Sequence, residues 1–540
     1  MSKDAWSQQH VFKVDTTVTI VDANVSPYNM IQPGDTLLFT SGQRSLLRIK
    51  NFTGEKDNPV IFMNDHGQVI FDTDHYYGIS ILNCRFFRLT GTGDANHFYG
   101  FRISKVANGA GIGIGGMSSD YEIDHVSIEN CKSAGIFAKT DPDCSFTSTR
   151  EKFTQYNTLI HDNYIGHVGT EGLYIGSTQY FGQTLNCNGV DTLLMPSLLD
   201  GVKVYKNIIE YSGWDGIQVS SASTNCQVFD NIVLFDSQEE YYGQMSGIIL
   251  GGGSKCDCNN NFISQGKGQG IQVFGLAGER IFNNIIIDAG KYFFPTDTTR
   301  RVYGIFVSDI SAEADSAFTI AFNTILNPKT DGIRFMSTVT KNNLIASNAI
   351  INPGAYDFYE NGNTSFTGND AYIMLPDPAS DVLIKNNYLA RNSDSAKFAA
   401  DGYSLLQGSP LINAAWAESL NITFDYFHTY RPYGAAADIG AVEYDPSVAG
   451  ITGQLISKPI LFPNPVKTWL TINYKVEKPS EIIAGIYSLS GTLVIQRNEH
   501  SKPCEIQTIS INVTNLPAGI YIYSLKSANS SISGKFIKSD

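Results

Sequence analysis

The sequence lacks several features that assign chains to common protein classes. It has no run of 18 apolar residues, so no membrane-spanning helix is expected. It also has no glycine-rich phosphate-binding loop, no Gly-x-Ser-x-Gly motif and no His-Glu-x-x-His motif. These absences exclude the usual signatures of nucleotide-binding proteins, serine hydrolases and zinc proteases.

Basic residues are scarce. The chain has 38 Lys and Arg against 52 Asp and Glu, a net charge of −14. From Leu455 onward there are nine Lys/Arg and five Asp/Glu, so the part before Leu455 carries −18. A body this acidic makes nucleic acid an unsuitable partner. It also argues against a long polyanionic ligand, unless basic residues cluster locally.

A short pattern is repeated along the middle of the chain. Each copy is a corner residue, a glycine, and two apolar residues with an outward-facing residue between them. An early copy begins at Ala134, and six more lie between Glu171 and Met336. The corner residues of these six copies are Glu171, Asp215, Ser246, Gln269, Tyr303 and Asp331.

A second pattern, an asparagine followed by an apolar strand, alternates with the first. Its shortest spacings are 23, 24 and 25 residues, and longer spacings indicate inserted loops. The asparagines are Asn207, Asn231, Asn261, Asn284, Asn323 and Asn348.

This period, with short β-branched strands and Gly/Asn turns, is typical of a solenoid. One repeat cannot bury its apolar face alone, but stacked repeats form a continuous core. We therefore predict an all-β fold, a right-handed parallel β-helix in which residues one repeat apart lie on adjacent rungs. Asn tolerates a left-handed corner, and its amide can bond to the equivalent Asn one rung above.

Two of the eight cysteines share a position in the repeat. Cys226 and Cys256 each precede a repeat asparagine by five residues, so we expect them on adjacent rungs, about 4.8 Å apart. That placement allows a disulfide or a buried ladder of free thiols. Cys256-Asp257-Cys258 lacks zinc-site spacing, so no metal is expected there.

Both ends of the repeat region resemble known β-helix proteins. Pro33-Gly34-Asp35 precedes one strand and Asn58-Pro59-Val60 opens the next, which resembles the start of many secreted polysaccharide lyases and related right-handed β-helix proteins. The resemblance implies an N-terminal cap over residues 1–60 and a β-helix with loop insertions over residues 61–445. The segment from Ser409 to Glu443 resembles the C-terminal cap of bacterial β-helix proteins, which covers the last open rung.

The C-terminal part differs in composition. Residues 446–454 form a predicted linker, and residues 455–540 contain six short alternating strands. Phe462-Pro463-Asn464-Pro465 and Leu516-Pro517-Ala518-Gly519 resemble the type A sorting domain of the type IX secretion system. This implies a small immunoglobulin-like β-sandwich and recognition by the type IX machinery. It also implies secretion, or attachment to the outer-membrane surface of a Gram-negative bacterium.

The alternation of in and out along each strand maps the outer surface. Lys139, Glu171, Tyr174, Asp215 and Gln218 come from three consecutive repeats, with insertions at 139–158 and 177–200 beside them. Loops inserted on one side of a solenoid usually build its binding surface. We therefore expect a groove on this side of the β-helix.

Glu171 and Asp215 are the first candidate catalytic pair. On adjacent rungs they would lie about 5 Å apart, which suits a retaining glycosidase, and the like charges would raise one pKa. The same two carboxylates can hold Ca²⁺, the one cofactor this pattern allows. Alternatively, both are corner residues that accept hydrogen bonds from nearby backbone N–H groups.

A lyase is the other catalytic hypothesis. Lys139 or Tyr174 would be the base, and Arg150, Lys152 or Lys139 would neutralise a uronate carboxylate. Trp214 offers a face for stacking a sugar. His161 and His167, which flank Asn163, are either bases or turn residues. The remaining predicted substrate-binding residues are Gln218, Tyr180 and Gln272.

These observations favour an exported, monomeric, polysaccharide-active protein, either a lyase or a glycoside hydrolase. The paired-Asp and Gly-His-Gly signatures of polygalacturonase-like β-helices are absent, which disfavours pectin hydrolysis by that route. The alternative is a non-catalytic glycan-binding or adhesin β-helix.

Overall fold

The structure is a computed structural model of the 540-residue chain. The predicted linker at 446–454 lies outside the described residues. No helix in the described part is long and apolar enough to cross a membrane. The described residues are 10–94, 97–291, 293, 300–354, 372–399, 402–416, 420–445, 459–462, 466–475, 480–488, 493–501, 506–527 and 530–538.

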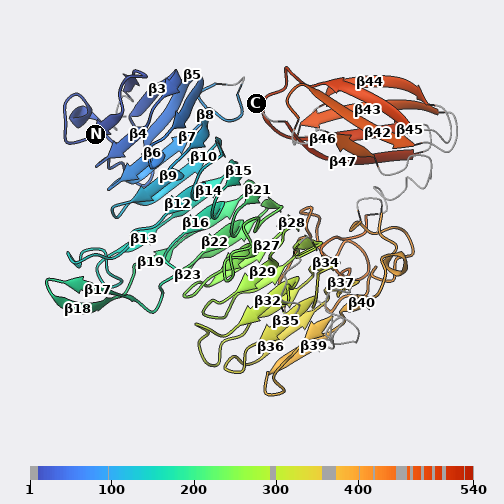
Figure 1. Ribbon diagram of the computed structural model, residues 1–540. Helices are drawn as coiled ribbons and strands as arrows, with labels where there is room; N and C mark the ends of the chain where they lie inside the picture. The colour runs from blue at the N-terminus through green and yellow to red at the C-terminus, as the bar shows by residue number, and fades with distance from the viewer. Residues whose placement is uncertain are drawn as a thin grey trace, which may run out of the picture.

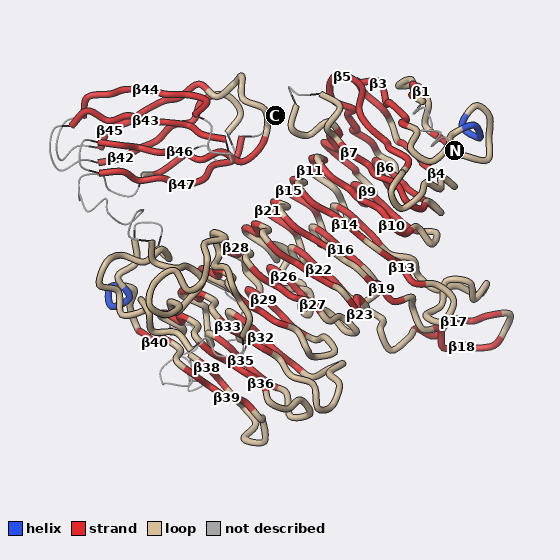
Figure 2. The backbone as a smooth tube through the Cα atoms, turned by 180° about the vertical axis from the view of Figure 1, so that it is seen from behind, coloured by secondary structure: helices blue, strands red, loops and turns tan. Residues whose placement is uncertain are grey.

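The main body is a right-handed parallel β-helix with three ladders of strands around one core (Figures 1 and 2). The first ladder begins at β1, so parallel pairing starts inside the segment expected to be a cap. Its strands are β1 (Val11–Val14), β3 (Thr36–Arg44), β5 (Val60–Thr73), β7 (Arg85–Thr90), β10 (Ser119–Asp124), β14 (Thr158–His161), β20 (Lys203–Tyr205), β24 (Cys226–Phe229), β27 (Cys256–Asn259), β30 (Arg280–Phe282), β33 (Thr319–Ala321), β36 (Asn343–Ala346) and β39 (Val382–Lys385).

The second ladder shares the long strand β5 with the first, because β5 pairs with β7 near its start and with β8 near its end. Its further strands are β8 (Phe101–Val106), β11 (Val126–Glu129), β15 (Tyr164–Val168), β21 (Ile208–Ser212), β25 (Ile232–Leu234), β28 (Phe262–Ser264), β31 (Ile285–Ile287), β34 (Thr324–Leu326), β37 (Ala349–Ile351) and β40 (Tyr388–Ala390).

The third ladder carries the glycine-containing repeat and runs the length of the solenoid. Its strands are β2 (Ile20–Asp22), β4 (Leu47–Lys50), β6 (Tyr77–Leu82), β9 (Ala110–Gly115), β12 (Ile136–Ala138), β16 (Leu173–Ile175), β22 (Ile217–Val219), β26 (Ser246–Leu250), β29 (Gln269–Val273), β32 (Ile305–Ser308), β35 (Ile333–Met336) and β38 (Ile373–Met374).

A stack of asparagines between the first and second ladders fixes the register. Each side-chain Nδ2 donates to the Oδ1 of the next Asn at 2.9–3.0 Å, from Asn163 through to Asn387. The predicted superposition of Asn207 and Asn231 is therefore confirmed. The left-handed corner, however, belongs to the preceding residue, such as Lys206 (φ 54°) and Asp230 (φ 56°), and not to the ladder Asn itself.

Disulfides join neighbouring parts of the coil. Cys226 and Cys256 are register partners on β24 and β27 and form a disulfide with a Cα–Cα distance of 4.4 Å. A second disulfide, Cys144–Cys187, ties the insertion before β13 to a hairpin. The hairpin strands are β17 (Gln183–Cys187) and β18 (Val190–Leu194), and a small parallel sheet beside them contains β13 (Thr154–Tyr156), β19 (Leu198–Asp200) and β23 (Ala222–Thr224).

The segment after β40 returns across the outside of the second ladder. A buried ion pair of Arg431 with Glu443, 2.9 Å long, holds this cap together, and the Arg431 guanidinium lies 4.1 Å from the centre of the Phe322 ring. Ala441 and Val442 pack on Ile285 of β31. The cap thus covers the outer face of the second ladder, while Ile384 and Leu389 of the last rung are each 43% exposed. The two short 3₁₀ helices described are η1 (Tyr28–Met30) and η4 (Asp394–Ala396).

The C-terminal part is a small antiparallel sandwich with its own apolar core (Figure 1). One sheet has the order β41 (Ile460–Phe462), β42 (Trp469–Lys475), β45 (Ile506–Asn512). The other has the order β44 (Leu493–Ser501), β43 (Ser480–Ser488), β46 (Gly519–Ser527), β47 (Ser530–Lys538).

Candidate functional site

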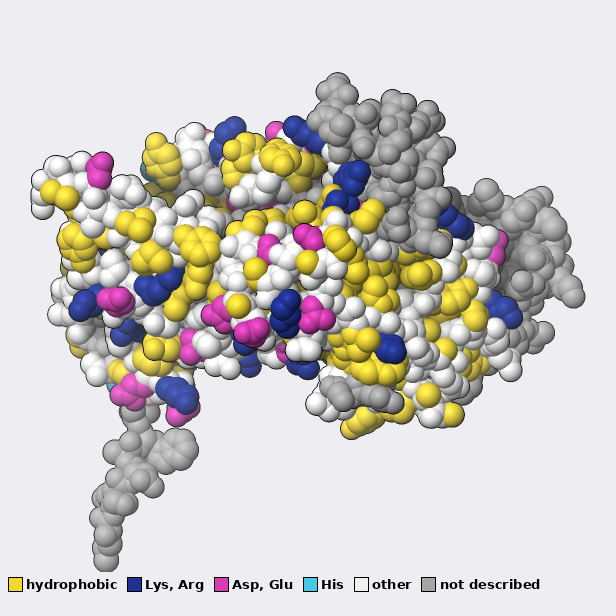
Figure 3. Space-filling model, turned by 90° about the horizontal axis from the view of Figure 1, so that it is seen from below, with side chains coloured by type: hydrophobic (Ala, Val, Ile, Leu, Met, Phe, Trp, Pro, Cys, Tyr) yellow, Lys and Arg dark blue, Asp and Glu magenta, His cyan; other side chains and the backbone are white. Residues whose placement is uncertain are grey.

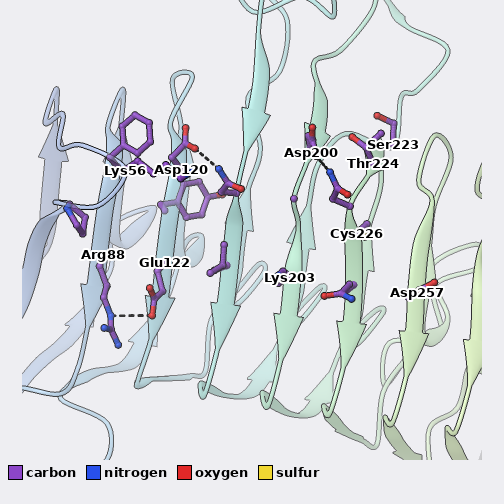
Figure 4. Close-up of a pocket in the computed structure, with 18 of the residues that line it drawn as sticks. Lys56, Arg88, Asp120, Glu122, Asp200, Lys203, Ser223, Thr224, Cys226 and Asp257 are labelled. Atoms are coloured by element: carbon purple, nitrogen blue, oxygen red, sulfur yellow. Dashed lines mark hydrogen bonds and ion pairs between the residues drawn. The ribbon is translucent and has the colours of Figure 1, made fainter. Parts of the chain in front are cut away.

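An open groove of about 980 Å³ lies on the outer surface of the first ladder. Its lining side chains project in a row from successive parallel strands, as Figure 4 shows for Arg88, Glu122, Lys203 and Asp257. One wall comes from the small parallel sheet, through Asp200 of β19 and residues 223–224 of β23. Because the groove is open and crosses successive strands, its shape fits an extended chain.

Strand alternation explains why these side chains reach the groove. In β10, Tyr121 and Ile123 are buried in the core while Glu122 between them faces outward. The same alternation on each rung produces one continuous column, which we call the groove column. Its members, each a register partner of the next, are Arg88, Glu122, Leu159, Lys203, Gln227, Asp257 and Arg280.

Each end of the groove column carries an ion pair between two neighbouring members of the column. Arg88 Nε lies 3.2 Å from Glu122 Oε1, and Arg280 Nη2 lies 2.5 Å from Asp257 Oδ2. Between these pairs, Lys203 has no ion-pair partner within the described part of the chain. Both of its column neighbours, Leu159 and Gln227, are uncharged. Lys203 is therefore the unpaired cation of the groove column, while Asp120 and Asp200, which also have no ion-pair partner in the described part of the chain, line the same groove.

A titratable cluster lies beside the groove at its N-terminal end. Asp124 is buried and accepts hydrogen bonds from Arg88 Nε (2.8 Å) and Thr90 Oγ1 (2.7 Å), and it lies 2.5 Å from His125 Nδ1. Burial alone would raise the Asp124 pKa, but these three partners together lower it to about 2. Asp124 is therefore ionised at any physiological pH and holds Arg88 in place.

His161 is the second buried member of this cluster. Its Nε2 lies 3.0 Å from Glu122 Oε1 and its Nδ1 lies 2.8 Å from Asp162 Oδ2. Burial lowers the His161 pKa, yet these two carboxylates outweigh it and bring the pKa to about 9. The imidazole is therefore a cation at neutral pH, and it donates to the Glu122 carboxylate that lines the groove.

Aromatic rings continue from His161 along the ladder. His161 stacks on Tyr205 at 4.4 Å between centroids, and Tyr205 stacks on Phe229 at 4.9 Å. Rings stacked face to face in this way stabilise the rungs, because each covers the face of the next. They leave ring edges, not faces, for contact with a ligand.

The same cluster is the candidate for metal binding. Among the described residues, one group of three offers ligand atoms within 4.8 Å of one another: Glu122, Asp124 and His161. However, Arg88 bonds the Asp124 carboxylate, and both His161 nitrogens are occupied by carboxylates. These residues fit an ion-pair network better than a metal site. Ca²⁺ at Glu171 and Asp215 stays a prediction.

The predicted pair Glu171 and Asp215 does lie on adjacent rungs, since the Gly172 N–H donates to the Asp215 carbonyl at 3.0 Å. The expected open groove is not found there. Glu171 is 3% exposed and Asp215 is 0% exposed, and neither Asp215 carboxylate oxygen has a hydrogen-bond partner among the described residues. Burial, with the nearby carboxylates of Glu171 and Asp236, raises the Asp215 pKa well above its usual value. A catalytic role for this pair stays a prediction.

Lys139 and Tyr174 are brought together, but in a packed arrangement. The Lys139 ammonium lies 4.9 Å from the centre of the Tyr174 ring and 2.9 Å from Asp141 Oδ1. Tyr174 is buried and stacks on Phe137. Its hydroxyl lies 3.1 Å from Thr178 Oγ1. A role for either side chain as a base stays a prediction.

The six predicted substrate-binding residues do not form one cleft. Arg150 donates to the Tyr180 carbonyl and lies over the Tyr180 ring. Trp214 stacks on Tyr241, and Lys152 is exposed in a turn. Gln218 and Gln272 are buried under the surface of the third ladder.

Sequence reasoning missed the groove column because it followed the third ladder, where the glycine repeat is conspicuous. A signal was present: Leu159, Lys203, Gln227, Asp257 and Arg280 each lie four residues before a ladder Asn.

Viewed from below, acidic and basic side chains are mixed across the surface and no basic strip is visible (Figure 3).

Two family models match the chain. A "Secretion system C-terminal sorting domain" matches residues 460–539, and a "Right handed beta helix region" matches residues 197–371. The C-terminal sandwich is thus a type IX sorting domain, and the protein is secreted or held at the surface of a Gram-negative cell. No curated protein matches the chain.

Solved structures show only a loose likeness. An alginate lyase from Paenibacillus sp. str. FPU-7 is 13% identical with a TM-score of 0.40, covering 61% of this chain and 99% of that one. Pectate lyase Pel9A is 14% identical with a TM-score of 0.37, covering 82% and 98%. The A-module of the Azotobacter vinelandii mannuronan C-5 epimerase AlgE6 is 13% identical with a TM-score of 0.36, covering 66% and 91%. At these values the likeness carries no argument about activity.

Proposed function

We propose that the exported solenoid binds a polysaccharide along the groove column and cleaves it there, as a lyase or a glycoside hydrolase. The observation that carries this proposal is the groove of about 980 Å³, which crosses six parallel strands and is lined by outward polar side chains. Strands lie about 4.8 Å apart, so six of them span roughly 24 Å, enough for several sugar units.

Glu122 is the candidate general acid or base. It lines the groove, its side chain is 30% exposed, and the His161 imidazolium and the Arg88 guanidinium fix its position. Protein cations on both sides hold one carboxylate rotamer, which is what positioned proton transfer requires. His161 and Arg88 act as positioning residues in this scheme, because both contact Glu122 directly.

Lys203 is the candidate partner of the reacting sugar. It lies two rungs from Glu122, roughly 9–10 Å along the ladder. An ammonium with no ion-pair partner in its own column can, at this distance, hold a uronate carboxylate in a lyase, or a sugar hydroxyl in a hydrolase. The proposal therefore assigns catalysis to the first ladder and not to the sealed acids of the third.

A non-catalytic glycan-binding protein is the second candidate. It is favoured by the hydrogen bonds inside the cluster, since both His161 nitrogens and both Asp124 oxygens already have protein partners. Structural ion-pair networks shift pKa values as active sites do.

The test is a panel of neutral and uronate-containing polysaccharides with the full chain. Binding is measured by affinity electrophoresis, hydrolysis by new reducing ends, and lyase action by ultraviolet absorbance of unsaturated products. Product release that is lost in Glu122→Gln supports catalysis, and binding without product supports the second candidate. Failure of every polysaccharide to bind contradicts both.

A further inference from the structure

The outer face of the second ladder is apolar where a solvated sheet would carry polar side chains. Its column of register partners is Tyr164, Ile208, Ile232, Phe262 and Ile285. An apolar stripe of this length must be covered in a stable soluble protein, because exposed contiguous apolar patches favour association. The C-terminal cap covers its far end, where Ala441 and Val442 pack on Ile285.

A different element covers the near end. Tyr164 and Ile208, with Tyr99 beside them, form one buried cluster with Ala518 and Ile537 of the sorting domain. We call Tyr164, Ile208 and Ile232 the docking stripe. Ile208 points away from the solenoid core, yet it is only 2% exposed. The sorting domain is thus seated directly on the solenoid.

The sorting domain presents a matching face. In β47, Phe536 points into the sandwich core, so Ile537 points outward by alternation. Ile537 is nevertheless only 7% exposed, because it lies in the cluster with Tyr164 and Ile208. The start of β46 also lies near the solenoid, since a Cβ built at Gly519 would be 3.5 Å from the Phe98 ring, an ordinary contact distance.

Charge complements the apolar contact. Lys535 lies on the same side of β47 as Ile537, two residues away, and is attracted to Asp230 of the solenoid. Asp230 also lies 3.1 Å from His428 Nε2 of the cap. Asp230 therefore interacts with a side chain of each covering element, Lys535 of the sorting domain and His428 of the cap.

We propose that the docking stripe is a binding surface for the chain's own sorting domain, and that displacement of the domain during export uncovers the stripe. The ends of β46 and β47 are held against the solenoid in the docked form. The export machinery therefore meets a sorting domain whose outward face at Ile537 is already occupied.

Full-length variants test this. Ile537→Asp and Ile208→Asp each place a charge in the contact without changing either core. We expect both to increase the radius of gyration measured by small-angle X-ray scattering. Leu383→Asp is the matched control, since Leu383 is an outward apolar residue of the first ladder that is already 47% exposed. It should leave the radius unchanged.

An apolar fluorescent dye separates docking from general damage. Ile537→Asp leaves an intact, uncovered stripe and should raise dye fluorescence several-fold, while Ile208→Asp makes the stripe itself polar and should raise it less. Circular dichroism should show unchanged strand content in both. Equal radius and equal dye binding in wild type and both variants would overturn the proposal.

Discussion

The groove column and the acids of the third ladder arise from the same coils, yet they meet water differently. Glu122 and Lys203 line an open groove, while Asp215 and Asp236 are each 0% exposed. In the groove, carboxylates face cations at ion-pair distance. Burial raises the pKa of Asp215, beside β22 of the third ladder, well above its usual value, and that of Asp236, in the loop between β25 and β26, to about 6. Exposure and charge pairing, and not the presence of acids, distinguish a reactive surface from a structural interior.

The largest difference between the two regions should appear in turnover. Glu122→Gln removes the groove acid but keeps the shape of the side chain, so kcat/KM should fall by about 100- to 10,000-fold, the usual contribution of general acid–base catalysis. Asp215→Asn should retain activity because no ligand reaches that side chain. Kinetics on a confirmed substrate decide this, and equal losses in the two variants would erase the contrast.

The free energy of unfolding should respond to the buried acids and not to the groove acid. The Asp236 pKa is raised from 3.8 to about 6 by burial, so folding favours its protonated form. The contribution of protonated Asp236 to the free energy of unfolding is therefore fully present below pH 3.8, and it is lost as the pH rises through about 6. Above that, burying the charge costs about 3 kcal/mol.

Asp236→Asn removes that cost, so the variant should be more stable than wild type at pH 8 by up to about 3 kcal/mol and no more stable at pH 4. Denaturant unfolding at both pH values measures the difference. Glu122→Gln in the groove is the contrast: it should give no gain in stability at pH 8, because it removes a carboxylate that is paired with Arg88 and His161. A variant Asp236→Asn that gains nothing at pH 8 would show that this acid is already neutralised or hydrated.

Much of the architecture could be predicted from the sequence, because the repeat imposes it. The spacing of Asn207, Asn231 and Asn261 determined which residues stack, and the structure confirms their ladder. The adjacency of Cys226 and Cys256 followed from the same register, while the choice of disulfide over free thiols did not. The spacing of the repeat therefore determines which residues are neighbours along the axis of the β-helix.

The site could not be predicted in the same way, because the spacing of a repeat does not reveal what covers each face. The insertion after β16 folds back so that the Tyr180 ring lies against Gly253, where a Cβ would be only 1.9 Å from the ring. Glycine at this position makes that contact possible. Inserted loops lie outside the repeat, and so the burial of Gln218 and Asp215 was not visible in it.

The smallest expected effect lies within the groove column itself. Gln227 carries no charge and sits between Lys203 and Asp257. Gln227→Ala should weaken polysaccharide binding by about 1 kcal/mol, roughly fivefold, the value of one neutral hydrogen bond. Gln272→Ala on the third ladder is the matched control, because Gln272 is buried and accepts a 2.9 Å hydrogen bond from Ser246. Titration calorimetry measures both, and a larger loss for Gln272→Ala would argue for a site on the third ladder.

The most direct test of the account is a map of backbone hydrogen exchange in the full chain with and without a bound polysaccharide. If the polysaccharide lies in the groove, new protection should appear along β10, β14, β20 and β24, centred on Glu122 and Lys203. Protection confined to β16, β22 and β26, around Glu171 and Asp215, would contradict it.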